Sequence, residues 1–284
     1  MKIILGGAQI GMKYGVSNVS AFSRENSYDL LQNALKTGIN TIDIASNYGA
    51  SHEIIREFGV DHFMIHSKLP SIKGYNNSHR NIDVEYRILF ELEKLLKELN
   101  TDSIHTLYFH SEDDIEIAND PKIYDLLKSL KKEGVIKSFG ASIYSKNNLN
   151  DVFDTVQIPL NYIQGNDMLN IYKPLKTVIC RSIFLQGVLL GTGNLEKDFI
   201  NKHGLSNWHN FLDSKGINPL QLCLAYAKMN CSSIVLGFDN SEQLLETMEL
   251  INNVNDKALR DILEEEMWRN YILQLDILKD PRLW

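Results

Sequence analysis

The stretch "NTIDIASNYGASHE", residues 40–53, contains a complete strand-to-helix unit. Its run "TIDIA" is rich in apolar and β-branched residues and predicts a short buried strand. The residues "SNYG" predict a polar loop, and "SHEIIREFG" has the apolar spacing of a helix. The same order of short strand and helix recurs along almost the whole chain, so this unit decides the fold class.

Eight such units follow one another in the 284 residues. The pattern predicts strands at 2–7, 41–45, 62–68, 104–110, 136–142, 155–160, 177–184 and 232–237. It predicts helices at 23–38, 51–59, 83–99, 122–134, 146–153, 167–176, 218–230 and 241–252, and a last amphipathic helix at 256–275. Eight units in a chain of this length favour an α/β fold, a (β/α)8 TIM barrel, with a single domain over residues 1–284.

An open, doubly wound sheet is the alternative, because periodicity does not distinguish a closed sheet from an open one. A dinucleotide-binding sheet of that type usually carries G-x-G-x-x-G after its first strand. Here the first candidate is "GGAQIG", and in the second, "GTGNLE", Glu196 stands where the third glycine belongs. The sequence therefore favours the closed barrel.

Composition excludes several classes of protein. A net charge of -7 lacks the basic footprint that nucleic-acid binding requires. The three cysteines are an odd number without a C-x-x-C pair, which argues against a disulfide framework. The N-terminal apolar run is too short for a signal peptide, and no run approaches the about 18 apolar residues of a membrane span. We therefore expect a cytoplasmic protein without a membrane or nucleic-acid partner; its oligomeric state cannot be read from the sequence.

Metal and hydrolase motifs are also missing from the sequence. The histidines do not follow H-x-H or H-E-x-x-H spacing, and no G-x-S-x-G is present, so we expect no metal site. The acids Glu112, Asp113 and Asp114 could imitate a metal cluster. Their place in a loop after the fourth strand instead predicts a solvated rim or part of a substrate-recognition loop.

Four candidate catalytic residues come from three strand ends. In barrels of this class, catalytic groups lie at the carboxyl ends of strands and in the loops that follow. The second strand reaches Asp43 with Tyr48 in its loop, the third ends at Lys68, and the fourth ends at His110. Taken singly, each has a structural interpretation: a helix cap or loop acid, a packed ring, a surface charge and a buried histidine. Together at one mouth of the barrel, they predict a catalytic set.

The chemistry of such a set follows from its charges. A phenol has a pKa of about 10 and is a poor proton donor at neutral pH. A nearby ammonium favours the phenolate and lowers that pKa, and a carboxylate keeps the amine charged and in place. The result is a general acid for an oxygen that gains negative charge, as in hydride addition to a carbonyl. The histidine could hydrogen-bond the substrate oxygen or help to relay the proton.

These residues and their flanking segments resemble the aldo-keto reductases. The matching segments are "LGGAQIGMKYG", "IDIASNYGASHE", "HSKLP", "LYFHSEDD" and "GFDNSEQLLE", so the resemblance covers essentially the whole chain. It implies a (β/α)8 barrel that reduces an aldehyde or ketone with NADPH, or with NADH. It also implies the roles of Asp43, Tyr48, Lys68 and His110 as the catalytic set.

The resemblance implies cofactor contacts as well. Ser142 and Gln157 are expected to hold the nicotinamide carboxamide, since a hydroxyl and an amide together supply donors and acceptors. The segment "RSIFLQG" resembles the family's pyrophosphate loop, and residues near the eighth strand are expected at the adenosine end. The full set of expected cofactor-binding residues is Gly7, Ser142, Gln157, Arg181, Ser182, Phe184, Gly187, Gly237, Asn240 and Gln243.

Three positions depart from the family's pattern. Ile143 replaces an asparagine, and Arg181 replaces the aromatic residue that stacks on the nicotinamide. Arg181 could stack in its place, bind an anionic substrate group or form a structural ion pair. Gln243 stands where many members carry the arginine that binds the 2′-phosphate of NADP. A glutamine cannot offer that phosphate the charged, two-pronged hydrogen bonding of an arginine.

The sequence leaves the substrate and one alternative function open. Arg181 and a polar mouth suggest a polar or anionic carbonyl compound, such as a sugar derivative. The loops 111–121 and 187–210 and the tail 268–284 are expected to set specificity, with Trp268 or Trp284 as a wall. The alternative is a non-catalytic nicotinamide-binding barrel that acts as a redox sensor or partner subunit.

Overall fold

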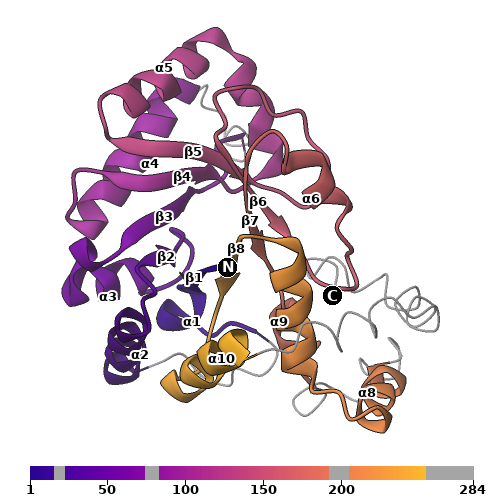
Figure 1. Ribbon diagram of the computed structural model, residues 1–284. Coiled ribbons are helices and arrows are strands. Elements are labelled where there is room, and N and C mark those ends of the chain that lie inside the picture. The colour runs from indigo at the N-terminus through magenta and orange to yellow at the C-terminus, as the bar shows by residue number, and fades with distance from the viewer. Residues whose placement is uncertain (16–22, 74–82, 192–204, 254–284) are drawn as a thin grey trace.

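The strands form a closed parallel barrel in which each strand pairs with its neighbours in the sequence (Figure 1). The computed structural model describes residues 1–15, 23–73, 83–191 and 205–253. The strands are β1 (Lys2–Gly6), β2 (Thr41–Asp43), β3 (Met64–Leu69), β4 (Ile104–Phe109), β5 (Ile136–Ser142), β6 (Thr155–Pro159), β7 (Thr177–Arg181) and β8 (Ser233–Leu236). Four register pairs between β1 and β8, from Lys2 with Ser233 to Leu5 with Leu236, close the barrel. The predicted (β/α)8 barrel is confirmed, and the open sheet is excluded.

Helices surround the barrel (Figure 1). The longer ones are α2 (Arg24–Lys36), α3 (Ser51–Phe58), α4 (Val84–Leu99), α5 (Pro121–Lys132), α8 (Leu205–Ser214), α9 (Pro219–Asn230) and α10 (Ser241–Asn253). Shorter helical segments are α1 (Ala8–Gly11), η1 (Val60–His62), η3 (Glu112–Asn119), α6 (Asp167–Tyr172) and η4 (Leu185–Gly187). The helices α2 and α10, which lie far apart in the sequence, contact each other on one side of the barrel.

Side-chain caps explain where several helices begin. Asp83 accepts a hydrogen bond from the backbone N–H of Glu85 at 3.0 Å at the start of α4. Asp120 and Asn218 cap α5 and α9 in the same way, and each precedes a proline in the first helical turn. A capping side chain satisfies an otherwise unpaired N–H, and proline fits where no N–H partner is needed.

The core lies between the barrel and its helices and also fills the barrel. Strand β6 is buried along its whole length, as expected for a parallel sheet covered by helices. Phe109 and Phe139 meet edge to face with ring centres 4.9 Å apart. Inside the barrel, His66 lies 3.1 Å from the hydroxyl of Tyr108, and burial lowers the pKa of His66 to about 3. The imidazole of His66 is therefore neutral in this buried position near pH 7.

The helix predicted at 146–153 is wrong, because this segment is irregular. Its backbone is bonded by side chains: the Tyr172 hydroxyl accepts from Asn147 N–H at 2.8 Å and donates to the Asn147 carbonyl at 2.7 Å. The Lys176 ammonium donates to the Asn150 carbonyl at 2.8 Å. Asparagine-rich segments favour such local bonding over helix. The helix predicted at 256–275 and the tail 268–284 lie outside the described residues.

The acids after β4 are structural rather than a solvated rim. Asp114 is fully buried and accepts from the backbone N–H groups of Ile72 at 2.8 Å and Lys73 at 2.9 Å. Burial raises the pKa of Asp114 even though these donors oppose the shift. Glu112 accepts from the N–H groups of Tyr144 and Ser145. These two acids join three loops, so the sequence interpretation holds only for the exposed Asp113.

None of the helices within the described ranges is both long enough and apolar enough to cross a bilayer. Among those same residues, no three His, Cys, Asp or Glu side chains gather in a way that could hold a metal ion.

Candidate active site

A cavity of about 1000 Å³ lies at the carboxyl ends of the strands. It is lined at one end by the four candidate catalytic residues, Asp43, Tyr48, Lys68 and His110. This volume is at the upper end of the range for ligand pockets, about 300–1,000 Å³, so the cavity has room for a large ligand.

Asp43 and Lys68 form a buried ion pair at the ends of β2 and β3. The Lys68 ammonium donates to the Asp43 carboxylate and, at 3.3 Å, to the carbonyl of Ile44, and both charged side chains are at most 5% exposed. Burial alone would lower the pKa of Lys68, but the charges of Asp43 and Tyr48 outweigh it, so that the pKa is raised. The amine is therefore held charged and in one position.

Tyr48 lies beside this pair. The Lys68 nitrogen is 5.2 Å from the centre of the Tyr48 ring. The loop that carries Tyr48 rests on Gly11, whose carbonyl accepts from Ala50 N–H at 3.0 Å. A Cβ on Gly11 would lie 1.9 Å from the Tyr48 carbonyl oxygen, and Gly49 adopts φ +56° with a Cβ position 2.3 Å from the Gly11 carbonyl oxygen. Two glycines thus allow the close backbone approach that fixes the position of Tyr48.

His110 follows β4 and faces the same cavity. Burial, together with the positive charges of Lys68 and Arg181, lowers the pKa of His110 to about 4. The imidazole is therefore neutral near pH 7, and it can donate one hydrogen bond without carrying a charge.

A chain of side-chain hydrogen bonds runs from Asp43 through Gln157 and Ser142 to Arg181. The Gln157 amide donates to Asp43 at 2.7 Å, and its oxygen accepts from the Ser142 hydroxyl at 3.2 Å. The Ser142 hydroxyl also accepts from Arg181 Nε at 3.4 Å. The structure therefore brings Ser142 and Gln157 together, with hydrogen bonds between the two residues and from Gln157 to Asp43.

Arg181 is fixed at the end of β7 beside Tyr144. Its guanidinium carbon lies 4.1 Å from the centre of the Tyr144 ring, and its nitrogens donate to Ser182 and to the Ile143 carbonyl, each at 3.3 Å. Within the described ranges no carboxylate pairs with Arg181, which excludes there the structural ion pair that the sequence left open. Arg181 lines the cavity and brings a positive charge to it.

The loop after β7 has an unusual backbone. Ser182, Leu185 and Gln186 adopt positive φ angles of 58°, 48° and 55°, and Gly187 follows at 95°. A left-handed conformation costs a non-glycine residue about 1–2 kcal/mol, and such strain is concentrated at ligand-binding sites. Ser182, Phe184 and Gly187, which the sequence predicts as cofactor contacts, all line the cavity.

The remaining cofactor candidates lie near β1 and β8. Gly7 lines the cavity, and a Cβ there would lie 2.6 Å from a methyl carbon of Ile44. Gly237 and Gln243 also line it. Asn240 instead caps α10 by accepting from Gln243 N–H at 2.8 Å.

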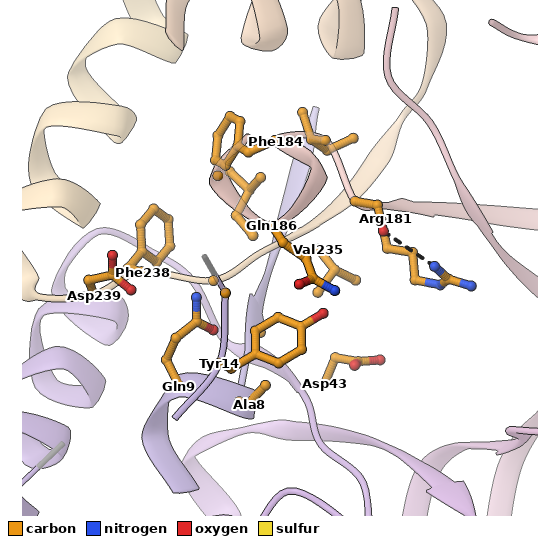
Figure 2. Close-up of a pocket in the computed structure, with 18 of the residues that line it drawn as sticks. Ala8, Gln9, Tyr14, Asp43, Arg181, Phe184, Gln186, Val235, Phe238 and Asp239 are labelled. Carbon is orange, nitrogen blue, oxygen red and sulfur yellow. Dashed lines mark hydrogen bonds between the residues drawn. The ribbon is translucent and has the colours of Figure 1, made fainter. Parts of the chain in front are cut away.

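Several lining residues were missed by the sequence analysis. Figure 2 shows Tyr14 with its hydroxyl directed to the side where Asp43 and Arg181 lie. Burial, and then the neighbouring Tyr48 and Tyr144, raise the pKa of Tyr14 to about 12, so it stays a neutral phenol. Among the other missed lining residues, Gln9, Asn47, Tyr144, Gln186 and Asp239 follow strand ends, a position that could have identified them, whereas Glu246 lies within α10.

Solved structures share this architecture. The glycerol dehydrogenase of Gluconobacter oxydans superposes with a TM-score of 0.66 and 20% identity, covering 92% of this chain and 90% of that chain. A Pseudomonas aeruginosa protein described as an aldo-keto reductase gives 0.63 and 19%, covering 89% and 90%. At these identities the likeness shows the fold alone.

Sequence comparisons give the family. The D-arabinose 1-dehydrogenase of Saccharomyces cerevisiae is 29% identical over 153 residues, which are 50% of this chain and 42% of that protein. The match thus spans less than half the length of this curated relative. A sequence profile described as "Aldo/keto reductase family" matches residues 2–264, almost the whole chain. This chain, with its barrel and its Asp43–Lys68 pair beside Tyr48, belongs to the aldo/keto reductase family.

Proposed function

We propose that this protein is a nicotinamide-dependent oxidoreductase that reduces the carbonyl of a small aldehyde or ketone to an alcohol. The observation that carries the proposal is the contact of Tyr48 with the charged Lys68, which Asp43 holds in the cavity. Membership of the aldo/keto reductase family supports the same reaction.

Tyr48 acts as the general acid. Its hydroxyl gives a proton to the carbonyl oxygen as that oxygen gains negative charge, and the Lys68 ammonium stabilises the phenolate left behind. Asp43 keeps Lys68 charged, and the Gln157 amide holds Asp43 from the other side. Because Asp43 and Lys68 are buried, these charge interactions are stronger than they would be in bulk solvent.

His110 orients the carbonyl. As a neutral imidazole it donates a hydrogen bond to the substrate oxygen without competing with Tyr48 as the acid. Its place in the same cavity as Tyr48 suits two hydrogen bonds to one oxygen.

The residues around the cavity suit a nicotinamide dinucleotide. Ser142 and Gln157 would hold the carboxamide, and the left-handed backbone of the loop after β7 is a conformation typical of ligand-binding loops. When bound, the nicotinamide supplies the hydride that the carbonyl carbon accepts.

A polar or anionic substrate, such as a sugar derivative, fits the remaining space. Arg181 brings a positive charge to the catalytic end without a carboxylate partner among the described residues, and Tyr144 fixes its plane. The name of the curated relative, a D-arabinose dehydrogenase, points to the same class of compound.

The test is oxidation of reduced nicotinamide, followed at its near-ultraviolet absorption band, with a panel of carbonyl compounds. We expect turnover, with higher kcat/KM for sugar aldehydes, ketoses and anionic carbonyl compounds than for apolar aldehydes of equal size. Faster reduction of the apolar aldehydes would contradict the substrate class. Tight nicotinamide binding without turnover of any compound would contradict the reaction and favour a non-catalytic sensor.

A further inference from the structure

The outer face of α4 carries a patch of exposed, large apolar side chains. Tyr86 is 62% exposed, Phe90 43% and Leu89 39%. The three lie within about one turn of α4, and the rings of Tyr86 and Phe90 stack with their centres 6.2 Å apart. The helix lies on the outside of the barrel, in contact with α3 and α5 (Figure 1). These three residues are here called the α4 patch.

The α4 patch differs from the other exposed, large apolar side chains of the described residues. Tyr14 and Leu190 line the cavity. Met1, Leu175 and Leu245 belong to three different segments of the chain. Single exposed apolar residues are ordinary, whereas adjacent ones on one surface mark an interaction site. Because the α4 patch does not line the cavity, its occupant is neither the substrate nor the cofactor.

The charged residues on either side of the α4 patch are sorted along the helix. Asp83 and Glu85 lie at its start, and Lys94 and Lys97 lie near its end. Glu85 is half-buried, and the other three are exposed. The helix dipole favours acids at the start and bases at the end of any helix, but it does not place large apolar side chains on the exposed face between them. This face is complementary to a second copy of itself that runs antiparallel.

The spacing of these residues fits a two-fold axis beside Phe90. Asp83 and Lys97 are each seven positions from Phe90, and Tyr86 and Lys94 are each four. Antiparallel pairing about that axis therefore brings Asp83 opposite Lys97 of the second copy. It brings Tyr86 opposite Lys94 of the second copy, and each Phe90 ring meets its own equivalent. These are an ion pair, a cation–π contact and an aromatic pair.

Glu93 is a further exposed acid on this face of α4. It follows Phe90 by three positions, so the same pairing brings it opposite Arg87 of the second copy. Arg87 pairs with Glu91 of its own chain at 2.6 Å, and its guanidinium carbon lies 5.7 Å from the centre of the Phe90 ring. A positive charge therefore lies at the edge of the α4 patch, where it attracts Glu93.

We propose that two copies of this protein associate through their α4 helices, which run antiparallel about a two-fold axis beside Phe90. Such an axis makes the same surface serve both copies. A contact through one helix of each copy is smaller than a standard interface of about 1,600 Å², so we expect a dissociation constant of about 10–100 μM. The proposal does not depend on the proposed function, because no residue of α4 lines the cavity.

Sedimentation velocity of the full chain over about 1–300 μM measures the association. We expect the average mass to rise with concentration from that of a monomer towards that of a dimer. Phe90→Ser should weaken the association at least about tenfold. Its matched control is Leu175→Ser, which removes an apolar side chain that is 71% exposed elsewhere and should leave the dissociation constant unchanged. A monomer at every concentration, or an equal effect of the control, would overturn the proposal.

A second pair of variants tests the charges. Lys97→Glu places an acid opposite Asp83 of the second copy and should weaken the association at least about threefold. Lys36→Glu is its control, because Lys36 is likewise an exposed cation in the last turn of a helix, but on α2. An equal effect of the two variants would contradict the pairing of Asp83 with Lys97.

Cysteine cross-linking tests the antiparallel register. Phe90→Cys places two thiols beside the axis, and diamide should oxidise them to one disulfide while its diazene takes up both hydrogen atoms. In the same pairing the Lys97→Cys thiols are about 21 Å apart and should not be joined. The natural cysteines are buried and should not compete. A Phe90→Cys protein that stays uncrosslinked at 100 μM, or equal cross-linking through Lys97→Cys, would overturn the antiparallel pairing.

Discussion

The ammonium nitrogen of Lys68 lies 5.2 Å from the centre of the Tyr48 ring while it pairs with the carboxylate of Asp43. The three residues come from two neighbouring strand ends and the loop between β2 and α3. Burial would lower the pKa of Lys68, but the Asp43 carboxylate raises it, so the amine beside the phenol is charged at neutral pH. Tyr48 therefore faces a fixed cation, which is what a phenol needs to act as an acid.

Replacing Lys68 should lower both the activity and the stability of the protein, for two different reasons. Lys68→Met should lower kcat at least about 100-fold, because the phenolate of Tyr48 loses its stabilising charge. It should also lower the free energy of unfolding by about 3–5 kcal/mol, because Asp43 is left buried and unpaired. Steady-state kinetics and urea denaturation measure the two effects.

The double variant Lys68→Met with Asp43→Asn is the control for that experiment. Removing both charges should restore much of the lost stability while kcat stays low. Recovery of activity along with stability would show that Lys68 acts only through folding.

A methyl group at Gly11, a residue that does not itself line the cavity, should displace Tyr48. In Gly11→Ala the new Cβ meets the Tyr48 carbonyl, which must shift because the contact is with backbone. We expect a fall in kcat of at least about tenfold with cofactor affinity changed less than about threefold. Gly38→Ala adds a methyl group where no atom lies within 4 Å, but at φ +87° it strains the backbone outside the cavity lining. It therefore controls for a loss of stability that does not displace Tyr48.

The readout that separates positioning from unfolding is the ratio of kcat to the fraction folded. A Gly11→Ala protein with native circular dichroism and parental kcat would contradict the positioning role.

The pH profile of kcat/KM should show no transition near pH 6.5 from the titration of His110. Burial lowers the pKa of His110 to about 4, so between pH 5 and 8 the imidazole is neutral and its protonation begins only as the pH falls towards 4. Measurement of kcat/KM over pH 5–8 tests this. A single-proton loss of kcat/KM centred near pH 6.5 that disappears in His110→Asn would show that His110 titrates normally and that its surroundings are not those described.

The strands and their ends could be predicted from the sequence because each follows from local pattern. "TIDIA" and "IHTLYFH" are short apolar runs followed by polar loops, so Asp43 and His110 fall at strand ends without knowledge of the fold. The helix expected at 146–153 failed because its backbone is bonded by Tyr172 and Lys176, residues outside the segment.

Other features could not be predicted because they depend on pairs distant in the sequence. The Gln157–Asp43 hydrogen bond spans 114 positions and crosses the barrel. The sequence predicts only a loop acid at Asp114, because the backbone N–H groups that bond its carboxylate belong to Ile72 and Lys73, which follow a different strand.

The most direct measurement is single-turnover reduction by Tyr48→Phe with reduced cofactor bound, together with the cofactor dissociation constant by calorimetry. The phenylalanine keeps the ring beside Lys68 and removes only the hydroxyl. We predict that the rate constant falls about 10²–10⁴-fold while the dissociation constant changes less than about threefold. A Tyr48→Phe protein that reduces its substrate at the parental rate would contradict the assignment of Tyr48 as the general acid.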